Sequence, residues 1–280
     1  MSELAERLGF TATDRVLVIS CDELGFSHAT NVAVYESLRN GTASSASLMV
    51  PAPWARGAAA AYRGEDIGAH LTLNAELDLY RWGPITVAPS LLDGDGGFPR
   101  TVSDVWEHAD LDEVRREWRA QVERAIYWGF DVSHLDVHLG EVELKPEFFD
   151  VYLDLAEELC LPVRLPARSA EARVGFPFRE LADERGVISP DQVLHLAALT
   201  APLDEALAAL EPGVTEIHAH PAIDTPELRA AAPDWQERVE QAALLAAHGE
   251  LSDAFERSGV RRIGYLSLRR LMRDAAPARR

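Results

Sequence analysis

Residue types that bind metals close four apolar, strand-like stretches of this sequence. The stretches are Val-Leu-Val-Ile-Ser-Cys-Asp-Glu (16–23), Ile-Gly-Ala-His (67–70), His-Leu-Asp-Val-His (134–138) and Glu-Ile-His-Ala-His-Pro (216–221). Barrels and open α/β sheets place their chemistry at the carboxyl ends of their strands. The pattern therefore predicts a metal-centred active site at one end of such a fold.

The His-x-Asp-x-His run is the strongest local signal. Side chains two apart on a strand point to the same face, so we expect His134, Asp136 and His138 on one side of a strand. Without a partner such as a metal, these groups would lose hydration at a free-energy cost. Asp136 could instead accept the ring N–H of a ligand histidine. The same spacing aligns His218 with His220, and an imidazole there could act as an acid on a leaving group.

Two other candidates are weaker when taken singly. Asp22 and Glu23 are adjacent carboxylates at the end of the first expected strand, before Gly25, which permits a tight turn. A helix cap followed by a surface acid is the alternative for this pair, and a satisfied core side chain is the alternative for His70. The remaining histidines fall in expected helices or loops and are interpreted as surface residues: His28, His108, His195 and His248.

Strand-like and helix-like segments alternate from end to end. We expect strands at 15–21, 46–50, 67–73, 133–138, 162–166, 214–219 and 261–266. We expect helices at 3–9, 27–39, 54–62, 110–128, 146–160, 189–199, 203–210, 234–246 and 251–258. This order implies parallel strands joined by right-handed crossovers. The sequence thus predicts a single α/β domain over residues 1–280, built on a barrel or near-closed sheet, with residues 74–101 as a long active-site loop.

The composition excludes several classes of function. The 27 basic and 46 acidic residues give a formal net charge of -19, which disfavours nucleic acid and anionic membranes as partners. The two cysteines provide no disulfide framework and no thiolate metal site. The first residues lack the apolar centre of a secretory signal, and no apolar run reaches the length of a membrane span, so we expect a cytoplasmic location.

The order of these motifs resembles that of the YdjC-like carbohydrate deacetylases, the chitooligosaccharide deacetylase group. The matching segments are Ile-Ser-Cys-Asp-Glu-Leu-Gly-Phe-Ser (19–27), Thr-Ala-Ser-Ser-Ala-Ser-Leu-Met-Val (42–50), Gly-Ala-His-Leu-Thr-Leu-Asn (68–74), Pro-Ser-Leu-Leu-Asp-Gly-Asp-Gly-Gly-Phe (89–98), Ser-His-Leu-Asp-Val-His (133–138), Leu-Pro-Val-Arg-Leu-Pro (161–166) and His-Ala-His-Pro (218–221). The resemblance implies a distorted TIM-like βα barrel that binds one divalent metal ion, Mg²⁺ or Zn²⁺. It also implies removal of N-acetyl groups from an amino sugar or a short N-acetylated oligosaccharide, and it is compatible with a homodimer.

The resemblance also assigns roles to individual residues. Asp22 matches the general base and His220 the general acid, and the metal ligands are Glu23, His70 and His138. Two positions depart from the family pattern. Glu23 replaces an aspartate, so its carboxylate reaches one methylene further, and Gly140 stands where members often have one more histidine.

Two further residues and two alternative functions complete the hypothesis. Arg164 could orient Asp22 or form a surface salt bridge, and Trp82 of the long loop could stack on a sugar ring. A phosphoesterase could use the same rim, although few Lys or Arg side chains lie beside the expected ligands. A metal- or sugar-binding protein without turnover is the alternative outside the enzymes.

Overall fold

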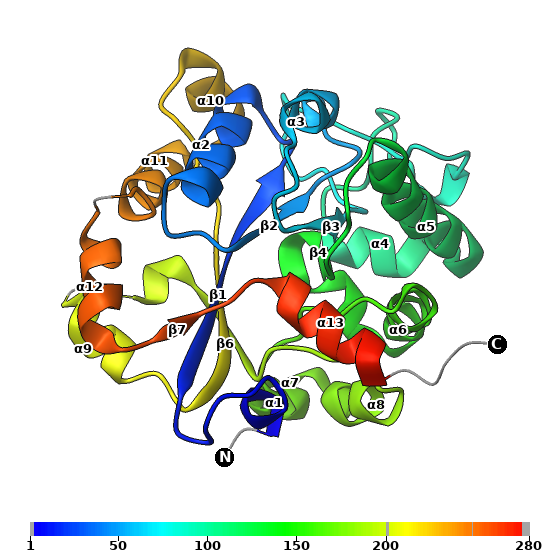
Figure 1. Cartoon of the computed structure of the whole chain (residues 1–280). Helices are drawn as coiled ribbons and strands as arrows, with labels where there is room; N and C mark the ends of the chain where they lie inside the picture. Colours follow the sequence, from blue (N-terminus) through cyan, green and yellow to red (C-terminus); the bar gives the residue numbers. More distant parts are fainter. Residues whose placement is uncertain (1–2, 200–201, 248, 276–280) are drawn as a thin grey trace.

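Seven parallel strands form one curled sheet at the centre of the computed structural model, which describes residues 3–199, 202–247 and 249–275 (Figure 1). The order is β4-β3-β2-β1-β6-β5, and β7 pairs with β1. The strands are β1 (Arg15–Leu24), β2 (Ser45–Leu48), β3 (Ile67–Leu71), β4 (Leu135–Val137), β5 (Gln192–His195), β6 (Gly213–Ala219) and β7 (Arg261–Arg262). This arrangement confirms the expected parallel α/β class.

The sheet is a curled half-barrel, which is close to the distorted TIM-like barrel that the resemblance implies but is not a full TIM barrel. Within the described residues, β4 and β5 end the strand order without pairing to each other. The expected strand at 162–166 would lie beside β4, but it forms only an isolated bridge between Leu135 and Val163. Pro162 and Pro166 bound this segment, and neither residue has the N–H that a longer ladder needs.

Helices surround the sheet (Figure 1). They are α1 (Glu3–Arg7), α2 (His28–Arg39), α3 (Ala55–Ala61), α4 (Val102–His108), α5 (Leu111–Tyr127), α6 (Pro146–Leu159), α7 (Glu171–Val174), α8 (Phe178–Glu184), α9 (Leu203–Ala208), α10 (Pro226–Ala231), α11 (Trp235–Leu244), α12 (Glu250–Ser258) and α13 (Tyr265–Ala275). Helix α5 shows why they form: Asp110 caps its first turn, and Val114, Trp118 and Val122 bury one face at helical spacing. No helix in the described ranges is both long and apolar enough to cross a bilayer.

The end of β1 is irregular at its two adjacent carboxylates, Asp22 and Glu23. On a regular strand these two side chains would point to opposite faces. The pairing of β1 with β2 shifts register between Cys21 and Leu24, and Glu23 adopts a left-handed conformation with φ 61°. Such a residue is strained, and strain of this kind occurs mostly at functional sites. Gly25 follows with φ 99°, where a Cβ would lie 3.1 Å from the carbonyl oxygen of Met49. The irregularity lets both acidic side chains reach the carboxyl rim of the sheet.

Two more expected elements differ from the structure. Residues 189–199 do not form a helix: they contain β5 and a 3-10 turn, Leu196–Ala198. The strand expected at 261–266 ends at Arg262, and α13 begins at Tyr265. Residues 74–101 contain only a 3-10 turn, Pro89–Leu91, and they pack against the core through buried side chains, among them Trp82, Leu91 and Phe98.

Candidate active site

A cavity of about 490 Å³ opens at the carboxyl ends of the strands. It gathers side chains from segments far apart in the sequence. Six residues predicted from the sequence line it, namely Asp22, Glu23, His70, His138, Arg164 and His220. Asp136 lies behind this wall and is fully buried. The convergence follows from topology, because the carboxyl ends of parallel strands meet at one edge of the sheet.

Arg164 organises the deepest layer of the site. Its guanidinium binds both oxygens of Asp22, at 2.6 and 2.8 Å, and also contacts Glu216 at 2.6 Å and Asp136 at 2.9 Å. Only 11% of the Arg164 side chain is exposed, so this is not a surface salt bridge. Burial opposes ionisation of Asp22, but Arg164 holds the pKa of this carboxyl well below its usual range. Asp22, His70 and Asp136 converge within 4.8 Å, yet the guanidinium already supplies the positive charge there.

His70 and His138 face each other in a way that suits a cation. Nδ1 of His70 lies 2.9 Å from Oδ2 of Asp136, and Nε2 of His138 lies 3.0 Å from Oε2 of Glu76. When each ring donates its N–H to its carboxylate, the other nitrogen of each ring carries a lone pair. These nitrogens, Nε2 of His70 and Nδ1 of His138, are 3.2 Å apart, and Oε1 of Glu23 lies 3.7 Å from the latter. Two lone pairs at this distance repel unless a proton or a cation lies between them.

Nδ1 of His138 thus lies between two possible partners for a shared divalent cation, Nε2 of His70 and Oε1 of Glu23. A tetrahedral ion with bonds of about 2.0–2.1 Å separates its ligand atoms by roughly 3.4 Å. Nδ1 of His138 lies at similar distances from its two neighbours, 3.2 Å from Nε2 of His70 and 3.7 Å from Oε1 of Glu23. Arg238 binds the other oxygen of Glu23 at 2.6 Å, which leaves Oε1 directed toward His138. Burial opposes ionisation of Glu23, but Arg238 lowers the pKa of this carboxyl, with smaller contributions from His220 and His138. Glu23 is therefore a carboxylate ready to act as a ligand.

Histidines of β6 lie on the other side of Asp22. Nδ1 of His218 is 3.5 Å and Nε2 of His220 is 3.9 Å from Oδ2 of Asp22. Burial lowers the pKa of His220 to about 4, so its ring is neutral at pH 7. The interpretation of His195 as an ordinary surface residue is wrong, because it ends β5 with its ring centroid 5.0 Å from that of His218. Among the other histidines interpreted as surface residues, His28 and His108 are exposed, whereas His248 lies outside the described residues.

Two predicted site residues lie away from the cavity. His134 is fully buried and stacks on Tyr265 with ring centroids 3.7 Å apart, so it cannot touch a substrate. Trp82 is 5% exposed, donates its Nε1–H to the carbonyl of Asn74, and is packed against Phe26. Its ring faces are covered, so the expected stacking on a sugar ring is not supported.

Several residues of the site were not found from the sequence. Glu76 comes from the 74–101 loop, Arg238 from α11, and Glu143 from a 3-10 turn after β4 (Val142–Leu144). Burial raises the pKa of Glu143 to about 8, so it is a neutral acid at pH 7. Glu216 could have been found, because it precedes His218 by two residues on β6 and shares its face. The others follow no local pattern.

Comparisons with known proteins show the family of the chain. The family described as "YdjC-like protein" matches residues 16–255. A carbohydrate deacetylase of Thermus thermophilus is 38% identical over 84% of this chain and 88% of its own, and one of Geobacillus stearothermophilus is 31% identical over 90% and 97%. The crystal structure of a candidate cellobiose-phosphate cleavage protein from Enterococcus faecalis superposes with a TM-score of 0.76 at 27% identity, covering 91% of this chain and 99% of that one. The chain therefore belongs to the YdjC-like protein family.

Proposed function

We propose that this protein is a metal-dependent deacetylase, which hydrolyses the N-acetyl amide of an amino sugar or a short N-acetylated oligosaccharide. The observation that carries the proposal is the pair of facing imidazole nitrogens of His70 and His138, 3.2 Å apart beside the carboxylate of Glu23. The names of the relatives support the reaction, since several are carbohydrate deacetylases and one from Serratia marcescens is a chitooligosaccharide deacetylase.

Glu23, His70 and His138 would hold one divalent cation. Two nitrogen donors and one oxygen donor suit Zn²⁺ better than Mg²⁺, which prefers oxygen ligands. When bound, such a cation polarises the acetyl carbonyl and makes water acidic enough to attack at neutral pH. Asp136 and Glu76 fix the tautomers of the two rings through the contacts described above, so we assign them a positioning role.

Asp22 is the group that accepts the proton of the attacking water. Arg164 holds both of its oxygens, so the carboxylate is a weak base whose advantage is its fixed position. His220 is neutral before the reaction because of its lowered pKa. The proton that it gives to the leaving amine must therefore be the one removed from the water. Asp22 can pass it on if the two side chains close to hydrogen-bond distance during the reaction, from the 3.9 Å that separates Oδ2 from Nε2 of His220.

A phosphoesterase is the less favoured alternative because a phosphate needs free cationic groups. The arginines that line the cavity are both already paired with carboxylates: Arg164 with Asp22, and Arg238 with Glu23 and Asp234. The cavity wall is otherwise acidic, with Glu76 and Asp234 among its members. An uncharged N-acetylated sugar fits these surroundings better than a phosphate dianion.

Acetate release from N-acetylated chitooligosaccharides, with and without added Zn²⁺ or Mg²⁺, tests the proposal. Asp22→Asn should lower kcat by roughly 10²–10⁴-fold, the usual contribution of a general base. Its metal content should stay equal to that of the wild type, because Asp22 is not one of the three ligands. Asp224→Asn, at an exposed residue, is the matched control and should retain full activity. A wild-type protein that releases no acetate with any of these cations would refute the deacetylase assignment.

A further inference from the structure

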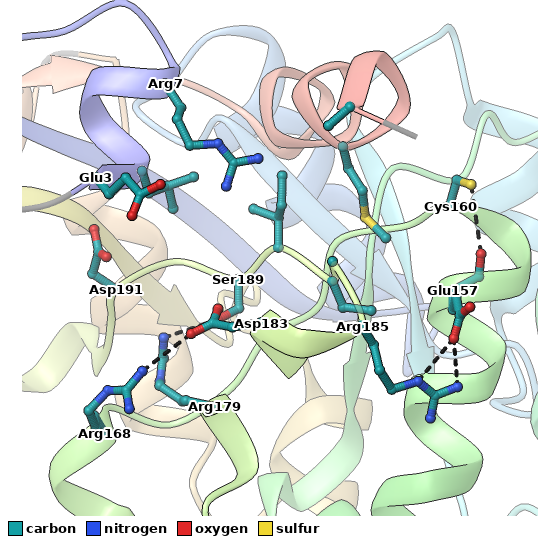
Figure 2. Close-up of a pocket in the computed structure, with 16 residues that line it drawn as sticks. Glu3, Arg7, Glu157, Cys160, Arg168, Arg179, Asp183, Arg185, Ser189 and Asp191 are labelled. Atoms are coloured by element: carbon teal, nitrogen blue, oxygen red, sulfur yellow. Dashed lines mark hydrogen bonds and ion pairs between the residues drawn. The ribbon is translucent and has the colours of Figure 1, made fainter. Parts of the chain in front are cut away.

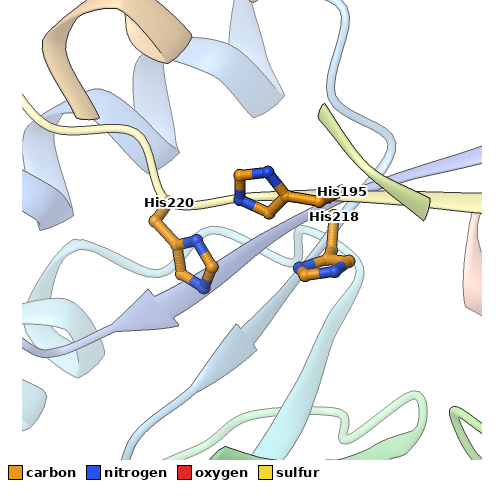
Figure 3. A group of neighbouring side chains, drawn as sticks. All are labelled: His195, His218 and His220. Carbon is orange, nitrogen blue, oxygen red and sulfur yellow. The ribbon is translucent and has the colours of Figure 1, made fainter. Parts of the chain in front are cut away.

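Three histidine side chains gather at the carboxyl ends of β5 and β6 and turn toward a common space (Figure 3). His195 and His218 are opposite each other in the parallel pairing of the two strands, and His220 follows two residues later. Each ring offers a nitrogen, and the three nitrogens lie within 4.8 Å of one another. The ring centroids are 5.0 to 5.7 Å apart. Strand register fixes His195 and His218, and His220 lies directly after the end of β6.

The surroundings leave these imidazoles poorly partnered. Nδ1 of His218 is buried and has no hydrogen-bond partner among the described residues. The nearest carboxylate oxygens lie at or beyond the limit of a hydrogen bond: Asp22 lies 3.5 Å from His218 and 3.9 Å from His220, and Glu237 lies 3.9 Å from His195. A buried ring nitrogen without a partner costs free energy, and a cation would satisfy that of His218.

The exposure of the rings also suits a metal. The side chains keep 24 to 33% of their surface exposed, so an ion from solution can reach them.

We propose that His195, His218 and His220 form a second cation site, which takes a transition-metal ion such as Zn²⁺ or Co²⁺ and rejects Mg²⁺. Three imidazole nitrogen donors suit these borderline ions, whereas Mg²⁺ selects oxygen. The rings need only turn inward, since the ligand atoms of a tetrahedral zinc ion lie about 3.4 Å apart. The absence of a carboxylate ligand distinguishes this site from the one formed by Glu23, His70 and His138.

The second site would regulate the first, and this consequence rests on the proposed function. His220 belongs to both: it is a ligand here and the carrier of the leaving-group proton there. A ring nitrogen bound to a cation has no lone pair left for a proton. An excess of Zn²⁺ should therefore inhibit the enzyme by removing its acid, while Mg²⁺ should not.

Cobalt stoichiometry tests the site without any measurement of activity. Co²⁺ binding is followed by its visible absorption and by elemental analysis after dialysis, for the wild type and for His195→Asn. Asparagine keeps an acceptor for the backbone N–H of Ala197, which lies 3.3 Å from Nδ1 of His195. We expect two equivalents in the wild type and one in His195→Asn. His108→Asn, at an exposed histidine of α4, should keep two.

The outcomes separate the two sites. If His195→Asn binds as much Co²⁺ as the wild type, with the same spectrum, the second site does not exist. If His195→Asn loses one equivalent and Glu23→Gln loses none, the second site stands and the proposed catalytic metal fails. Circular dichroism of His195→Asn checks that the variant is folded.

Inhibition by zinc tests the regulatory consequence. His195→Asn should have wild-type acetate release at low Zn²⁺, because His195 has no part in the reaction. At excess Zn²⁺ the wild type should lose at least about tenfold in rate, a modest share of what an acid catalyst contributes, and His195→Asn should not. Equal inhibition of both proteins would show that zinc acts elsewhere.

Discussion

A cavity of about 720 Å³ lies between α1, α8 and α13 (Figure 2), whereas the cavity at the carboxyl ends of the strands measures about 490 Å³. The larger one is rich in charge, but several of its charged groups already have partners. Arg168 pairs with Asp183, and Arg185 pairs with Glu157. Arg179 is buried and donates to the backbone carbonyls of Leu165, Pro166 and Pro190.

The smaller cavity differs in the state of its polar groups. Nε2 of His70 and Nδ1 of His138 face each other, the carboxyl of Glu143 keeps an oxygen without a partner among the described residues, and His220 has a strongly lowered pKa. Groups held in such states cost stability, and active sites are where they concentrate. The state of the polar groups therefore favours the smaller cavity as the proposed active site, whereas volume alone would favour the larger one.

Matched variants in the two cavities give the largest expected contrast. Glu23→Gln removes the charged ligand of the proposed cation and should lower acetate release by about 10³-fold, or about 4 kcal/mol of transition-state stabilisation. Asp183→Asn in the larger cavity should change the rate by less than about twofold, because exposed side chains away from a site have small effects. Steady-state kinetics measures both. A comparable loss of rate in Asp183→Asn would contradict the assignment of the active site to the smaller cavity.

The carboxyl-end site could be predicted from the sequence to the extent that its residues close apolar strands. Asp22, His70 and His138 each follow such a run, and the meeting of parallel strands at one edge brings them together. Pairing with β2 also explains how Glu23 joins them, since the register shift at the end of β1 redirects its side chain. That shift depends on the neighbouring strand and has no signal in β1 itself.

His195 shows why the rest could not be predicted. The strand β5 has only four residues, Gln-Val-Leu-His, followed by Leu-Ala-Ala, and this apolar run also satisfies a helical period. Pairing with β6 makes this segment a strand, and this pairing places His195 opposite His218. The position of His195 therefore follows from the folded sheet and not from the local sequence. Glu76 and Arg238 reach the site from a loop and a helix, and their approach depends on long-range packing.

The buried arginines of the two cavities give the next contrast. Arg164→Met leaves Asp22, Asp136 and Glu216 without their cation and should reduce the free energy of unfolding by about 3 kcal/mol at pH 8. Without Arg164 the pKa values of Asp22 and Asp136 rise, so the loss should shrink as the pH falls and these two carboxyls take up protons. Arg179→Met removes donors from carbonyls, which do not titrate, and should cost roughly 1–3 kcal/mol at every pH.

Urea unfolding at pH 5 and pH 8, followed by circular dichroism, separates these two behaviours. A loss in Arg164→Met that is the same at both pH values would mean that the carboxylates near Arg164 find other partners. The same measurement on Arg179→Met supplies the reference for an arginine whose role is structural.

Glu143→Gln should have the smallest effect of these variants, and it should stabilise the protein instead of destabilising it. Only 3% of Glu143 is exposed, and burial, together with the charge of Asp136, raises its pKa to about 8. The unfolded chain ionises this carboxyl near its ordinary pKa of 4.5, so wild-type stability declines as the pH rises from there toward 8. Glutamine cannot ionise, so the variant should match the wild type at pH 4 and exceed it at pH 8 by on the order of 2 kcal/mol.

Glu117→Gln is the matched control for this last prediction. Glu117 is also a buried glutamate, but its oxygens accept hydrogen bonds from the backbone N–H groups of Ile85 and Thr86 in the long loop. An amide loses one of these acceptors, so Glu117→Gln should destabilise the protein by about 1–3 kcal/mol. If Glu143→Gln behaved in the same way at pH 8, Glu143 would have to be a satisfied structural carboxylate. Glu143 would then no longer distinguish the smaller cavity from the larger one.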